Sequence, residues 1–104
     1  MATKKSSSRK TKSKAPYVVI RTYSAGVHVG ELAARKGTEV TLKSARRIWN
    51  WRGANTLHEI SLRGVGAGSK VSETVASIDL TQAIEVIPCT EESEKNLRSV
   101  TWSP

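Results

Sequence analysis

The fold is decided by residues 17–43, YVVIRTYSAGVHVGELAARKGTEVTLK. Within this stretch, runs rich in β-branched and aromatic residues are typical of strands, and we expect three of them, at 17–23, 27–33 and 39–43. Gly26 and Gly37 mark the two turns, because glycine adopts positive φ without a steric cost. Connections this short join antiparallel strands. The stretch therefore predicts a three-stranded antiparallel meander.

The first strand presents two alternating sets of side chains, because successive residues of a strand point to opposite faces. We expect the core-facing set to be Val18, Ile20 and Thr22. The opposite set is Tyr17, Val19, Arg21 and Tyr23.

After the meander the pattern changes from strand to helix. Ser44 is a plausible N-cap for a short helix over 45–51, which Gly53 would end. Ala45, Ile48 and Trp49 would share one face of this helix. The spacing therefore predicts that Trp49 belongs to the core.

The remaining elements follow from capping and alternation. Thr56 and Glu59 have the spacing of a capping box and predict a second helix over 56–63. Strands are expected over 70–80 and 83–87, and Thr90 is expected to cap a final helical turn over 91–97. The order β-β-β-α-α-β-β-α predicts an α+β domain, with a mainly antiparallel sheet of about five strands and two or three short helices.

The positive charge of the 104-residue chain is uneven: 17 Lys and Arg face 9 Asp and Glu, for a net charge of +8. Residues 1–15 hold six of the basic residues and no acid, which leaves 11 basic residues for the same nine acids in 16–104. We expect 1–15 to be a disordered basic arm before a single domain, 16–104, because the arm has too little apolar surface to offset the entropy of ordering. Its non-specific contacts with nucleic acid would come from Lys4, Lys5, Arg9, Lys10, Lys12 and Lys14.

No secretory or membrane signal is expected. The basic residues near the start are not followed by an apolar stretch, and no run approaches the roughly 18 apolar residues of a membrane span. The only cysteine, Cys89, cannot form an internal disulfide. We therefore expect a soluble protein that stays in the cytoplasm in which it is made, with no membrane association.

Arginine and tryptophan are concentrated in 46–52, and both residue types recognise phosphates, nucleobases and protein partners. One interpretation is that Trp49 is core and that Arg47, Trp51 and Arg52 form a binding rim. The alternative is packing alone, with Trp51 covering the edge of the core and the arginines solvated. The candidate binding residues are Arg46, Arg47, Asn50, Trp51 and Arg52.

Catalytic and metal-binding patterns are weak. Cys89 has no nucleophile signature around it, and neither His28 nor His58 is near it in sequence. One cysteine and two distant histidines do not have the spacing of a zinc site. We expect no enzyme activity, no cofactor and no metal.

Three motifs carry a resemblance: 21–27 (RTYSAGV), 45–51 (ARRIWNW) with Gly53 and Ala54, and 85–91 (EVIPCTE). They resemble a family of small uncharacterised proteins of tailed bacteriophages and prophages, over most of 17–102. The resemblance implies a viral accessory or virion protein, found in the host cytoplasm or in the virion, and assigns no catalytic residue.

Three functional hypotheses follow. The first is an accessory protein that binds nucleic acid or a host partner through the arm and the Arg/Trp rim. The second is a virion structural protein whose arm contacts packaged genome or a neighbouring subunit. The third is a protein that sequesters a small nucleotide. A homo-oligomer is compatible with each.

Overall fold

The meander predicted over 17–43 is present in the computed structural model, which describes residues 15–101. In chain order the elements are β1 (Tyr17–Thr22), β2 (Val27–Lys36), β3 (Glu39–Asn50), α1 (Leu57–Arg63), β4 (Lys70–Val71), β5 (Val75–Leu80), β6 (Ala83–Pro88) and α2 (Glu91–Ser99). The α+β class and the antiparallel sheet are confirmed, with six strands and two helices among these residues. The predicted arm, 1–15, lies outside the described residues apart from Ala15.

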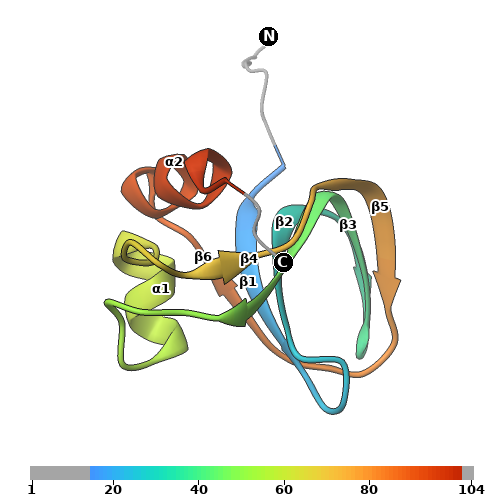
Figure 1. Ribbon diagram of the computed structural model, residues 1–104. Helices are drawn as coiled ribbons and strands as arrows, with labels where there is room; N and C mark the ends of the chain where they lie inside the picture. The colour runs from blue at the N-terminus through green and yellow to red at the C-terminus, as the bar shows by residue number, and fades with distance from the viewer. Residues whose placement is uncertain (1–14, 102–104) are drawn as a thin grey trace, which may run out of the picture.

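The sheet must be curled, because the connection between β5 and β6 is too short for a flat one. The strand order is β4-β3-β2-β1-β6, and β5 pairs with the same edge of β3 as β4 does. β5 and β6 are therefore at opposite edges, yet only Thr81 and Gln82 separate them in the chain. Two residues cannot cross a flat sheet whose strands are about 4.8 Å apart. In Figure 1, β5 folds over one side of the curl, and α1 and α2 lie together on the other side.

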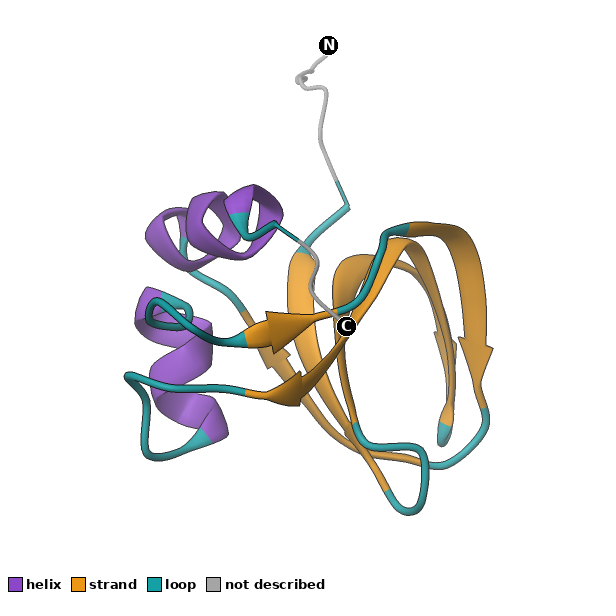
Figure 2. Cartoon of the chain, in the orientation of Figure 1, coloured by secondary structure: helices purple, strands orange, loops and turns teal. Residues whose placement is uncertain are grey.

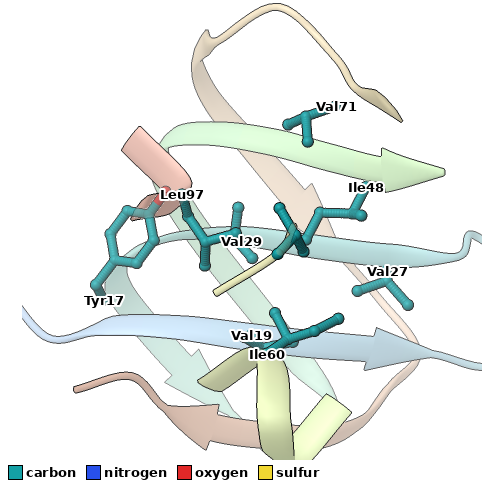
Figure 3. Packing of buried hydrophobic residues seen from close by; sticks show 9 residues of the cluster. Tyr17, Val19, Val27, Val29, Ile48, Ile60, Val71 and Leu97 are labelled. Atoms are coloured by element: carbon teal, nitrogen blue, oxygen red, sulfur yellow. The ribbon is translucent and has the colours of Figure 1, made fainter. Parts of the chain in front are cut away.

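Both faces of β1 are buried, because the curl encloses one face and the helices cover the other (Figure 2). We call the first set the inner cluster: Val18, Ile20, Val40, Leu42, Ala45, Leu80 and Ala83. The second set is the outer cluster, shown in Figure 3: Tyr17, Val19, Val27, Val29, Ile48, Ile60, Val65, Val71 and Leu97. The expected core-facing side chains of β1 are buried, but the prediction of a single buried face is incomplete, since Tyr17 and Val19 are core as well.

A bulge produces part of the curvature. Val29 pairs with Arg46 and Glu31 with Lys43, so Gly30 on β2 opposes two residues of β3. A Cβ atom on Gly30 would lie 3.0 Å from the Lys43 carbonyl oxygen, which makes glycine the residue that fits this close approach. Ser44, expected as a helix N-cap, is instead the bulged residue with φ of 49°. Bulges bend the strand that carries them and increase its twist.

The helix predicted over 45–51 is wrong, because β3 continues through the bulge to Asn50. Arg47 pairs with His28 of β2, and Ile48 pairs with Val71 of β4. A short run that fits a helical stripe also fits strand alternation, and here the neighbouring strands supply the hydrogen bonds. The single strand predicted over 70–80 is divided into β4 and β5, both of which pair with β3.

The two helices form where their caps predict. The Thr56 side chain accepts from the Glu59 amide, and the Thr90 side chain accepts from the Ser93 amide. Thr90 also joins the helices, because its hydroxyl donates to the Leu62 carbonyl at 2.7 Å. The Ser93 hydroxyl donates to the Ile60 carbonyl. α1 and α2 are therefore fixed to each other as well as to the outer face of the sheet.

Candidate functional site

The segment 46–52 lies mostly on β3, so its side chains alternate between the two faces of the sheet. Ile48 belongs to the outer cluster, whereas Trp49 is 50% exposed. The prediction that Trp49 is core is therefore wrong. Trp51 is half-buried and packs against the outer cluster. The roles expected for the two tryptophans are reversed. Trp49 points away from the outer cluster because it follows Ile48 on β3, and Trp51 lies beyond the end of β3 and packs against that cluster.

Arg46 is buried, and its side chain fixes two separate segments. Its Nε donates to the Ser72 carbonyl at 2.9 Å, and its Nη1 donates to the Leu97 carbonyl at 3.0 Å. Only 7% of the residue is exposed. Arg46 thus joins β3 to the start of the β4–β5 segment and to the end of α2, as a structural residue on the helical side.

Arg47 has the opposite environment. It is exposed and lies on the inner face of the sheet, the face that the curl encloses. Its Nε donates to Nε2 of His28 at 3.3 Å. The backbone of β3 is fixed at this position by Ser72, whose hydroxyl accepts from the Arg47 amide at 2.8 Å. Arg47 and His28 border a cavity of about 210 Å³ between β2, β3 and β5. The lining residues are His28, Ala45, Arg46, Arg47, Ser72, Val75 and Ile78.

His28 is a buried histidine that keeps one nitrogen without a partner. It is 1% exposed, and burial, followed by the charge of Arg47, lowers its pKa to about 4. The imidazole is therefore neutral near pH 7. Because Nε2 accepts from Arg47, the proton is assigned to Nδ1. Nδ1 is buried and finds no hydrogen-bond partner among residues 15–101, which is unusual for a buried polar atom.

Trp49 lies beside the basic side chain of Lys70. The Nζ of Lys70 is 5.6 Å from the centroid of the Trp49 ring. Lys70 pairs with Asn50 at the end of β3, and Arg47 precedes Trp49 by two residues on the same strand. We call Arg47, Trp49 and Lys70 the inner platform. It combines an accessible aromatic ring with two basic side chains on the side of the sheet that faces away from the helices.

The other candidate residues do not join this platform. Trp51 lines a shallow groove of about 390 Å³ on the helical side, which also includes Asn55 and His58. Arg52 is exposed, and its amide donates to the Ser69 hydroxyl at 2.8 Å in the 64–69 loop. Asn50 is exposed beside Lys70. The predicted rim of Arg47, Trp51 and Arg52 is therefore not one surface.

Cys89 lies between β6 and α2, half-buried against the outer cluster. Burial raises the pKa of its thiol, which favours the unreactive protonated form. His28 and His58 are in different cavities, and within residues 15–101 no three His, Cys, Asp or Glu side chains are grouped as metal ligands.

Lys70 was missed as a candidate residue, and His28 was weighed only as a catalytic or zinc-binding residue. The signal for His28 was its position in a strand, between Val27 and Val29, where a buried polar side chain is worth examining. Lys70 gave no signal, because its proximity to Trp49 arises from the pairing of β3 with β4, across 19 intervening residues in the chain.

No helix in the described part of the chain is long and apolar enough to cross a membrane.

Neither the curated proteins nor the solved structures include a match to this sequence. One family model does match, over residues 15–97, which takes in β1 to β6 and most of α2. The chain therefore belongs to the family described as "Domain of unknown function (DUF6948)".

Proposed function

We propose that this chain is a non-enzymatic accessory binding protein of a bacteriophage, and that it contacts single-stranded nucleic acid through the inner platform. The observation that carries the proposal is the half-exposed Trp49 ring next to Lys70 and Arg47. Aromatic rings beside cations bind single strands, because bases stack on the ring while the cations contact phosphates. The phage origin rests on the resemblance of segments 21–27, 45–51 and 85–91.

The charge distribution supports the choice of this face. α2 carries three acids in its first turn, Glu91, Glu92 and Glu94, and it lies on the opposite side of the sheet. The first turn of α2 is therefore an unfavourable place for a polyanion, and the inner platform is a favourable one. The six basic residues within 1–15 add attraction that depends on salt and is independent of sequence. Neither part reads base edges in a defined groove, so we expect little sequence specificity.

The test is fluorescence anisotropy of the full chain with a labelled single-stranded oligonucleotide at several salt concentrations. Trp49→Ala should weaken binding about ten-fold, the size expected for one lost stacking contact, while Trp49→Phe should retain most of the affinity. Leu62→Ala is the matched control, because Leu62 is 48% exposed on the helical side. It should bind as the wild type does.

Two further variants separate the platform from the basic segment. Arg47→Ala should weaken binding. Arg35→Ala should not, because Arg35 lies at the end of β2 away from His28 and Arg47. Replacing the six basic residues of 1–15 by glutamine should reduce the salt dependence while leaving the effect of Trp49→Ala intact. If Trp49→Ala and Arg47→Ala both bind like the wild type, the platform is not the site and the proposal is wrong.

A further inference from the structure

The cavity beside the inner platform has walls of two kinds. Val75 and Ile78 of β5, with Ala45 of β3, provide apolar surface, and the exposed guanidinium of Arg47 provides donors. Val75 is 47% exposed although it is a large aliphatic residue. Ligand sites commonly combine apolar walls with a small number of polar groups that fix orientation.

The polar wall suits one negative charge. The guanidinium of Arg47 uses its Nε for His28, and its fork geometry matches an oxyanion. His28 is neutral and accepts from Arg47 through Nε2, and its Nδ1 is buried out of reach of a ligand. No Asp or Glu lines the cavity. The Arg46 guanidinium is already bonded to the Ser72 and Leu97 carbonyls, so Arg47 supplies the accessible positive charge. One such charge balances a monoanion better than a dianion, because an uncompensated charge beside apolar walls is costly.

The size limits the ligand. A volume of about 210 Å³ is below the roughly 300–1,000 Å³ of pockets that hold drug-sized molecules. The cavity can therefore take a small molecule, or the end of a larger one. Its apolar part would lie against β5, and its charged part would lie at Arg47.

We propose that the cavity between β2, β3 and β5 binds the carboxylate end of a small aliphatic ligand, with the carboxylate at Arg47 and the aliphatic part against Val75 and Ile78. This chemistry occurs in a free carboxylic acid and at the carboxyl terminus of a peptide. The site does not depend on nucleic-acid binding, although Arg47 serves both.

The probe is N-acetyl-leucine, titrated into the full chain and followed by NMR of the His28 and Arg47 side chains. We expect saturable shift changes with a dissociation constant on the order of 1 mM, as for a ligand with few atoms. N-acetyl-leucinamide has the same shape without the charge and should bind at least about ten-fold more weakly. The ring signals of His58, which lies in the groove on the helical side, should not change.

A hexapeptide that ends in leucine distinguishes the two sources. If it binds more tightly than N-acetyl-leucine, the ligand is a carboxyl terminus; if only N-acetyl-leucine binds, the ligand is a small acid. Both results support the site. Absence of saturable change at His28 with either compound, or equal binding of the amide, overturns it.

Variants locate the site. Arg47→Gln keeps a donor for His28 but removes the charge, and it should weaken binding of N-acetyl-leucine at least about ten-fold. Arg35→Gln is the matched control and should bind normally, because Arg35 lies at the end of β2 away from His28. Trp49→Ala should also bind N-acetyl-leucine normally, which separates this site from the nucleic-acid platform. Wild-type affinity in Arg47→Gln would contradict the proposal.

Discussion

Arg46 and Arg47 are neighbours in sequence and lie on opposite faces of one sheet. On the helical face, Arg46 is buried and donates to two backbone carbonyls, so its charge serves the fold. On the inner face, Arg47 is exposed beside a cavity and a histidine with an unused nitrogen. The comparison shows that neighbouring arginines on one strand have different roles: Arg46 is satisfied by backbone carbonyls, whereas the Arg47 side chain stays exposed.

The sharpest way to break this comparison is to exchange each arginine for methionine. Arg46→Met leaves the Ser72 and Leu97 carbonyls without their charged donor and should reduce the free energy of unfolding by about 3 kcal/mol. Arg47→Met loses one bond of 3.3 Å and leaves a single acceptor, Nε2 of His28, without its donor, so it should cost about 1 kcal/mol. Urea unfolding measures both. Equal losses would mean that the two faces do not differ in this way.

The next effect concerns pH. Burial holds the pKa of His28 at about 4, below the 6.5 of the unfolded chain. Between these values the unfolded state binds the proton first, so stability falls as pH drops from 6.5 to 4 and is unaffected by this group above 6.5. The loss should be on the order of 2 kcal/mol.

His28→Leu is the control for the pH effect. It removes the titrating group and the unpartnered Nδ1, so the variant should lose less stability than the wild type over the same pH range. The difference between the two proteins isolates His28 from carboxylates that titrate nearby in pH. Identical pH profiles would show that His28 is not buried as a neutral ring.

The smallest effect separates the two tryptophans. Trp51 packs against the outer cluster, so Trp51→Ala should reduce the free energy of unfolding by about 1.5 kcal/mol through lost apolar burial. Trp49→Ala should change it by less than about 0.5 kcal/mol, as at other exposed positions. Chemical denaturation of both variants checks this. A larger loss in Trp49→Ala would restore the expectation that Trp49 is core.

The candidate site was predictable only in part. Sequence alone singled out 46–52 and included Arg47, which is part of the inner platform and borders the cavity. It assigned the wrong faces, because the spacing of Ala45, Ile48 and Trp49 fits a helical stripe and the assignment of faces depends on which element forms. His28, Lys70 and Val75 reach Arg47 or Trp49 only through pairing and curling of the sheet.

By itself, the sequence determined the elements whose signals are local: the meander with its turns at Gly26 and Gly37, and the helices capped by Thr56 and Thr90. The hydrogen bonds of a cap or a tight turn form within a few residues, so neighbours in sequence suffice to specify them. Only the tertiary structure decided that β3 continues through 45–50, because the hydrogen-bond partners of a strand lie on other strands, here around His28 and Val71. That pairing placed Arg46 in the core and left Arg47 and Trp49 on the inner face.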